Sequence, residues 1–296
     1  MSLTKTYTTP TDSSKNWRAR GFTVIASLLA LALVVAAGYE FFNAWILRDA
    51  ADGPHLWHIS ELVGLAILLA GSVLSLLRRP EKKPLLAQFL VVSMVILAVG
   101  VMFFEIKAAA LFIVMGLFVT TYPATRALLS ISPREGRVSK VVLVLSLLMG
   151  VFLAPVALKE IHWQIIGMTE NDIHALDFHW IGSALMMVLL VLAGVLSSTK
   201  RPGWMELGII TGVTYSFLGV VAMILQDGYA GSWSGGGGLF AIVVGVWYIL
   251  FTILEAQKMK VAKGGASVTT PHVRHIFPQG SEGETIERNT QQLAKV

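Results

Sequence analysis

The chain has 296 residues, of which 55% are hydrophobic and only 14% are charged. Water-soluble domains carry fewer apolar and more charged residues, so this composition excludes an ordinary soluble enzyme and indicates an integral membrane protein. The absence of cysteine excludes disulfides, thiolate metal sites and thioether-attached haem. The net charge of +5 comes from basic residues that are distributed as in the loops of a membrane protein. We therefore expect no nucleic-acid partner.

Eight apolar stretches are long enough to cross about 30 Å of hydrocarbon as helices, at about 1.5 Å per residue. In chain order they cover residues 22–44, 59–77, 85–104, 108–125, 141–158, 180–198, 207–225 and 239–254. Backbone amides cannot stay unpaired in lipid, and these runs lack the period-2 alternation of barrel strands. The sequence therefore predicts an all-α integral membrane fold, with eight transmembrane helices surrounded by a lipid bilayer.

Basic residues indicate the orientation of these helices. If the N-terminus is cytoplasmic, all but three of the 23 Lys and Arg residues fall in cytoplasmic segments. The three exceptions are Arg48, Lys107 and Lys159. An odd number of helices would destroy this segregation, which is the pattern expected of cytoplasmic loops. We therefore predict a plasma-membrane protein with both termini in the cytoplasm.

Two segments of the chain, residues 58–80 and 179–202, resemble each other. Both begin with His, contain Leu-Ala-Gly and end with Arg-Pro, at a nearly constant separation. The same frame maps the first four predicted helices onto the last four. Because four is even, the two halves have the same orientation, which predicts parallel repeats related by a pseudo-two-fold axis along the membrane normal.

This repeat divides the chain into four parts. Residues 1–20 form a polar cytoplasmic tail, 21–130 the first four-helix repeat, and 131–255 the second. Residues 256–296 contain few apolar side chains, so we expect a mobile cytoplasmic tail. The four consecutive glycines at 235–238 predict a flexible joint in the last outer loop, because they lack the Lys of a phosphate-binding loop.

The predicted outer side holds five of the seven histidines and many carboxylates. In each half, a Glu ends the first helix, a His begins the second, and an acidic residue ends the third. Imidazoles and carboxylates are ligands for Zn, Mn or Fe. The spacing His55-x-x-His58-x-x-Glu61 can also place three polar side chains on one helical stripe. The candidate metal ligands are Glu40, His58, Glu61, Glu105, Glu160, His179 and Asp227.

Other interpretations of these residues stay open. Polar side chains also collect at helix ends because the ends reach water, and His55, His162 and His174 taken singly are expected to be solvated or interfacial. On that interpretation the chain is a structural or accessory subunit with membrane-protein partners. The helix centres contain no charged residue or His, which argues against a coupled transporter. Whether the chain is an enzyme is left open.

A second cofactor hypothesis takes His58 and His179 as axial ligands of haem b or a chlorin, with one His from each of two related helices. The plan of eight helices in two halves is similar to that of the haem A synthases. However, the chain lacks a second membrane-embedded His in each half and lacks the paired cysteines of that family. The resemblance therefore implies no haem A synthase activity here.

Two stretches carry a further resemblance. They are Asp52-Gly-Pro-His-Leu-Trp-His58 and Arg79-Pro-Glu-Lys-Lys-Pro-Leu-Leu-Ala-Gln-Phe89. Both resemble uncharacterised multi-pass membrane proteins of bacteria. This resemblance implies a bacterial plasma membrane and no particular activity.

Overall fold

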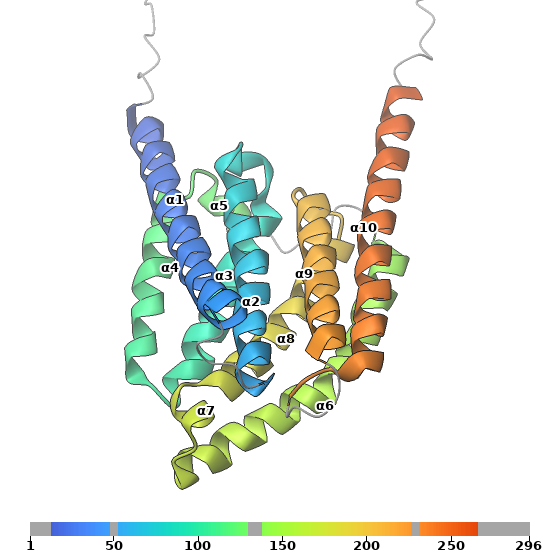
Figure 1. Ribbon diagram of the computed structural model, residues 1–296. Coiled ribbons are helices and arrows are strands. Elements are labelled where there is room, and N and C mark those ends of the chain that lie inside the picture. Colours follow the sequence, from blue (N-terminus) through green and yellow to red (C-terminus); the bar gives the residue numbers. More distant parts are fainter. Residues whose placement is uncertain (1–12, 48–52, 130–137, 226–230, 266–296) are drawn as a thin grey trace, which may run out of the picture. The chain divides into compact units, whose positions relative to one another are not determined.

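The computed structural model describes residues 13–47, 53–129, 138–225 and 231–265, and their regular elements are all helices (Figure 1). Within these ranges seven helices are long and apolar enough to cross a membrane. They are α1 (Ser13–Phe41) with its π-helical continuation η1 (Phe42–Leu47), α2 (Gly53–Leu77), α3 (Pro84–Met102), α6 (Lys140–Glu170), α8 (His179–Ser198), α9 (Trp204–Leu225) and α10 (Ser234–Gly265). The prediction of an all-helical multi-pass membrane protein is confirmed at this level.

The fourth predicted crossing is a shorter helix. It consists of η3 (Ile106–Ala109) and α4 (Ala110–Thr121), which together form an apolar helix shorter than the other seven. At about 1.5 Å per residue this helix is about 24 Å long, somewhat less than the hydrocarbon thickness. The described connections contain three further short helices, η2 (Pro80–Lys82), α5 (Thr125–Leu128) and α7 (Ile173–Leu176).

The long helix α6 has well-defined ends. The Ser139 hydroxyl accepts a hydrogen bond from the Val142 amide at 3.3 Å, which caps one of the amides left unpaired in the first turn. At the other end, Asn171 adopts a left-handed conformation with φ 56°, and its amide donates to the Gly167 carbonyl. Asn tolerates this conformation better than most residues, so the chain can turn sharply into α7.

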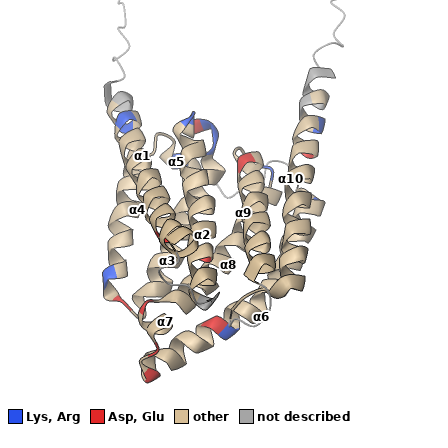
Figure 2. Cartoon of the chain, in the orientation of Figure 1, with Lys and Arg blue, Asp and Glu red and all other residues tan. Residues whose placement is uncertain are grey.

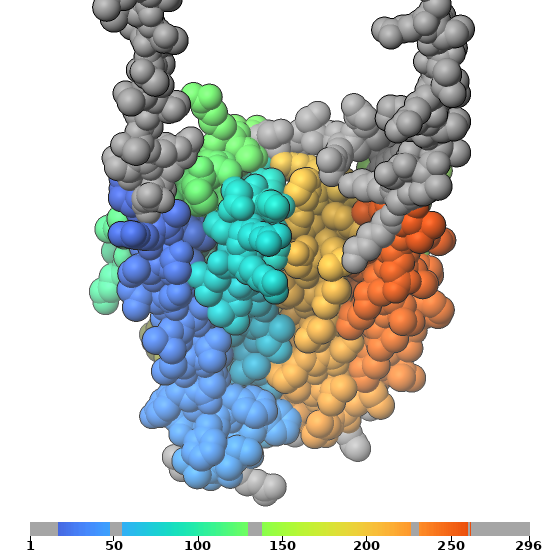
Figure 3. Space-filling view, turned by 90° about the horizontal axis from the view of Figure 1, so that it is seen from above, coloured from blue at the N-terminus to red at the C-terminus, as the bar shows by residue number. Residues whose placement is uncertain are grey.

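Helices α2, α3, α8 and α9 form the centre of the helical unit that ends at Ala256. α2 packs against α9, α3 packs against α8, and α2 also contacts α8. In Figure 3 the blue-to-cyan surface of α2 and α3 adjoins the gold surface of α9. In the most apolar stretch of α8, 61% of the residues are buried, whereas in that of α1 only 22% are buried. α8 is therefore a core helix, and much of the apolar surface of α1 is left to face lipid.

Two structural details occur both beside α2 and beside α8. Arg79 and Lys200, which follow α2 and α8, both adopt left-handed backbone conformations, with φ 61° and 52°. Surface grooves also lie between α1 and α2 and between α6 and α8. The first groove is lined in part by Val34, Ala37, Ala66, Ile67 and Ala70, and the second by Ala154, Ala157, Met187, Val188 and Val191.

The four-glycine run is helical, so the prediction of a flexible joint is wrong. Residues 235–238 lie in the first turns of α10. A Cβ atom at Gly219 would be 2.6 Å from the Gly238 carbonyl oxygen, and one at Gly212 would be 2.6 Å from the Gly245 carbonyl oxygen. The glycines allow the backbones of α9 and α10 to touch, which is a common way to pack membrane helices.

Charged side chains lie near the two ends of the helices. Figure 2 shows Lys and Arg near the start of α1 and around η2, whereas acidic side chains gather around α6 and α7 at the opposite end. We call the end that carries α7 the acidic end. The histidines described next lie at this end.

Candidate functional site

Four histidines from three helical elements converge at the acidic end, and we call them the imidazole cluster. His55 and His58 lie on α2, His174 on α7, and His179 is the first residue of α8. For histidines on different elements, the distance between ring centroids ranges from 4.8 Å, between His55 and His174, to 5.8 Å, between His174 and His179. His58 and His179, the pair related by the repeat, are 5.3 Å apart. The fold therefore gathers rings that lie far apart in the sequence.

Three members of the imidazole cluster lie close enough together to hold a metal ion after small movements of their rings. His55, His174 and His179 each offer a ring nitrogen, and these three nitrogens lie within 4.8 Å of one another. All three residues are half-buried. Among the described residues, His174 Nε2 and His179 Nδ1 have no hydrogen-bond partner, although both atoms are buried. Because buried ring nitrogens normally have a partner, these two atoms are suited to bind an ion.

Asp172 orients His174. Asp172 is the N-cap of α7, and its Oδ1 atom lies 3.4 Å from His174 Nδ1, while its Oδ2 atom accepts a hydrogen bond from Trp180 Nε1 at 3.0 Å. The Trp180 indole, and then His174, hold the pKa of Asp172 below its usual value despite some desolvation. A carboxylate on one ring nitrogen that leaves the other exposed to an ion is the usual arrangement of a metal-binding histidine.

Gln164 of α6 holds α7 and the start of α8 in place. Its side chain is fully buried, and Nε2 donates to the Ala175 carbonyl at 2.7 Å while Oε1 accepts from the Ile181 amide at 3.1 Å. Phe178, the N-cap of α8, supplies no side-chain hydrogen bond. The Ile181 amide is one of the unpaired donors at a helix start, so Gln164 replaces the missing cap. One side chain thus positions the helical elements that carry His174 and His179.

Two buried carboxylates lie next to the imidazole cluster, and we call Glu61 and Glu160 the carboxylate pair. They are 2% and 0% exposed. His58 Nδ1 is 3.2 Å from Glu61 Oε2, and the Ser183 hydroxyl donates to the same oxygen. Ser183 also interacts with Glu160, and the two carboxylates are close enough for their charges to repel. With the Ser183 proton directed to Glu61, neither Glu160 oxygen has a donor among the described residues.

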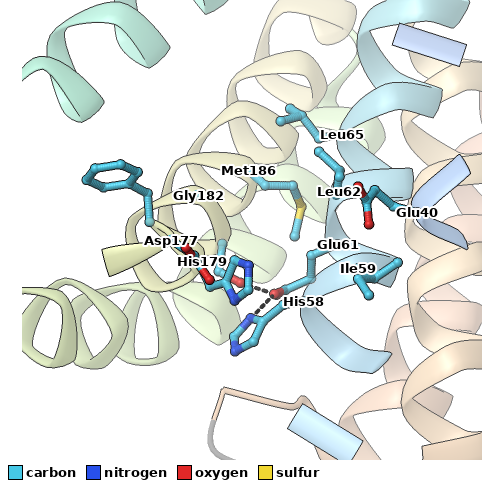
Figure 4. Close-up of a pocket in the computed structure, with 12 residues that line it drawn as sticks. Glu40, His58, Ile59, Glu61, Leu62, Leu65, Asp177, His179, Gly182 and Met186 are labelled. Carbon is cyan, nitrogen blue, oxygen red and sulfur yellow. Dashed lines mark hydrogen bonds and ion pairs between the residues drawn. The ribbon is translucent and has the colours of Figure 1, made fainter. Parts of the chain in front are cut away.

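A cavity of about 340 Å³ opens beside Glu61. Figure 4 shows the labelled side chains of α2 and of the first turns of α8 pointing toward one another around it. Three carboxylates and two imidazoles line the cavity, and among the described residues no Lys or Arg does. Its lining residues include Glu40, His58, Glu61, Leu62, Leu65, Asp177, His179 and Met186. The negative lining favours a cation over an anion.

The candidate ligands named from the sequence fall into three groups. His58, Glu61, Glu160 and His179 lie together, and Glu40 lines the adjoining cavity. Glu105 instead caps η3, where its carboxylate accepts a hydrogen bond from the Lys107 amide at 2.9 Å. Asp227 lies outside the described residues.

Sequence reasoning missed several residues of this site. His174, Asp172 and Ser183 were not candidate ligands, and His55 was expected to be solvated. The three-residue spacing from His55 to His58 was a usable signal, because positions three apart share a helical face. His174 carried no comparable signal, since it lies on the four-residue helix α7 in a connection between two long helices.

No protein-family model, curated protein or solved structure matches the chain. Its function is therefore argued from the geometry of this site.

Proposed function

We propose that this chain is a multi-pass protein of the plasma membrane that binds one transition-metal ion at its outward-facing end through His55, His174 and His179. The observation that carries the proposal is the convergence of three ring nitrogens within 4.8 Å. Two of the rings come from the α7–α8 segment and one comes from α2. The Asp172 carboxylate on His174 gives additional support, because it leaves Nε2 directed away from Asp172.

The ligand set favours Zn²⁺ or Fe²⁺ over Mn²⁺ at this position. Imidazole nitrogen suits Zn, Fe, Ni and Cu, whereas Mn prefers carboxylate and water oxygen. Zinc–nitrogen bonds are about 2.0–2.1 Å long, so three ligands of one ion need nitrogens somewhat closer together than the 4.8 Å limit found here. Small rotations of half-buried rings supply that contraction. Three histidines leave one tetrahedral position open to water.

The proposal includes the finer architecture. We infer eight membrane crossings in two parallel repeats, with the shorter helix of residues 106–121 as the fourth crossing and both termini cytoplasmic. The reciprocal packing of α2 on α9 and α3 on α8 supports the repeat, as do the paired grooves and the matched left-handed residues Arg79 and Lys200. The separation of basic from acidic ends supports the orientation.

Metal analysis of the purified full-length protein tests this function. We expect bound zinc or iron near one equivalent, and His174→Ala should weaken Zn²⁺ affinity by at least about tenfold. His162→Ala is a matched control, because His162 is exposed on α6 and is not part of the imidazole cluster. The proposal fails if the wild type binds no Zn²⁺ at micromolar concentrations, or if the two variants behave alike. A Soret band in the visible spectrum would favour the haem hypothesis instead.

A further inference from the structure

The carboxylate pair is the most unusual electrostatic feature of the described bundle. Glu61 and Glu160 lie within helices long and apolar enough to span a membrane, and both are almost completely shielded from solvent. No Lys or Arg of the described residues forms an ion pair with either side chain. Burying two anionic groups next to each other is costly unless a positive charge or several donors compensate them.

The surroundings supply few donors. Ser183 has one proton, which it directs to Glu61 Oε2, His58 reaches the same oxygen, and the buried Trp57 indole also lies near Glu61. The Glu61 Oε1 atom and both Glu160 oxygens have no hydrogen-bond partner among the described residues. Gly231 covers Glu160 so closely that a Cβ atom there would lie 2.5 Å from Oε1. The backbone thus encloses these oxygens while leaving them without partners.

We propose that Glu61 and Glu160, together with the Ser183 hydroxyl oxygen, hold a second cation beside the imidazole cluster. Carboxylate oxygens and one hydroxyl oxygen are hard ligands, which suit Mn²⁺, Mg²⁺ or Ca²⁺ better than a nitrogen-preferring ion. A bound divalent ion compensates both anions and provides the partners that their oxygens lack. This site does not depend on the imidazole site, because the two use different side chains.

The cavity gives this ion a route to the site. Glu61 lines the cavity, and Glu40 and Asp177 add two more carboxylates along its wall. A cation that enters the cavity therefore passes acidic groups before it reaches the carboxylate pair. Among the described lining residues, carboxylates are the charged groups that this ion meets.

The test is a Mn²⁺ titration of the full-length protein in detergent, followed by loss of the electron paramagnetic resonance signal of free Mn²⁺. With one equivalent of Zn²⁺ bound at the imidazole site, we expect one Mn²⁺ to bind in addition. Glu160→Gln should weaken Mn²⁺ binding by at least about tenfold and leave Zn²⁺ binding unchanged. His174→Ala should do the reverse. A loss of Mn²⁺ binding alone therefore separates failure of this site from failure of the imidazole site.

Glu255→Gln provides a matched control. Glu255 forms an ion pair with Lys200 at 2.8 Å, away from the cavity, so its replacement removes a carboxylate without touching either site. The proposal is overturned if the wild type binds no Mn²⁺ at millimolar concentration. It is also overturned if Glu160→Gln, shown to be folded by its retained Zn²⁺ binding, takes up Mn²⁺ like the wild type. Infrared spectra of the ion-free protein give a further test. If the wild type takes up no Mn²⁺ and shows a carboxylic-acid band that is absent in Glu160→Gln, the carboxylate pair is neutralised by protons and the cation proposal is refuted.

Discussion

Gln164 links the stability of the fold directly to the geometry of the metal site. In Gln164→Leu the Ile181 amide loses its acceptor in a buried position, and an unsatisfied buried donor costs about 1–3 kcal/mol. The Ala175 carbonyl still accepts a hydrogen bond from the Phe178 amide in this variant. Losing the hydrogen bond from Gln164 therefore costs only about 0.5–1.5 kcal/mol at this carbonyl. We therefore expect a destabilisation of about 2–4 kcal/mol.

Reversible unfolding in mixed detergent, followed by tryptophan fluorescence, measures this loss. Because Gln164 positions α7 and the start of α8, we also expect Zn²⁺ affinity to fall by about 10–100-fold, as when other groups that orient ligands are removed. Gln88→Leu is the matched control, since Gln88 is a buried glutamine that donates to the Leu128 carbonyl at 2.7 Å. It should lower stability but not Zn²⁺ affinity. The reasoning is refuted if Gln164→Leu changes stability by less than about 0.5 kcal/mol or leaves Zn²⁺ affinity unchanged.

Three further predictions concern orientation, pH and helix packing. A cysteine at Ser232 should react with an impermeant thiol reagent in intact cells while one at Ser132 should not, and labelling of Ser132→Cys in sealed cells would contradict the eight-crossing topology. The lowered pKa of Asp172 stabilises the fold above the ordinary Asp value of about 3.9, and this contribution disappears as pH falls through the folded-state pKa. Melting curves between pH 6 and 3 should therefore show a smaller acid loss in Asp172→Asn than in wild type; equal losses would count against this role. Gly212→Ala should lower stability by about 1–3 kcal/mol, because its Cβ would lie 2.6 Å from a backbone oxygen of α10. Gly116→Ala should not lower stability, because a Cβ atom there would have nothing within 4 Å. Equal effects of the two substitutions in unfolding experiments would argue against the backbone contact.

Much of the fold could be predicted because lipid imposes simple rules. Seven of the eight predicted spans correspond to long apolar helices, since length and hydropathy alone decide whether a helix can cross hydrocarbon. The fourth span was harder, because its α-helix begins only after the 3₁₀ helix η3 and ends at Thr121, which leaves α4 shorter than the predicted span. The glycines at the start of α10 were misinterpreted because glycine occurs both in flexible loops and at close helix contacts, and only the position of α9 distinguishes the two cases.

The candidate site was partly predictable for a similar reason. Internal symmetry brought His58 and His179 to attention, and the structure places their rings 5.3 Å apart. Symmetry cannot indicate groups that occur in only one half. His174 and Asp172 lie on a connecting segment, and Ser183 is a small polar residue of the kind that often bonds to its own helix. Their roles depend on how α6 and α2 pack around them, which no local pattern encodes.

The carboxylate pair also has a consequence for biosynthesis. Glu61 lies on α2, and its partner Ser183 follows 122 residues later in the chain. During translation, α2 therefore reaches the membrane before the helices that will enclose its carboxylate have been made. A charged or strongly polar side chain facing lipid is unfavourable. Glu61 therefore makes the insertion of α2 less favourable until α6 and α8 pack around its carboxylate.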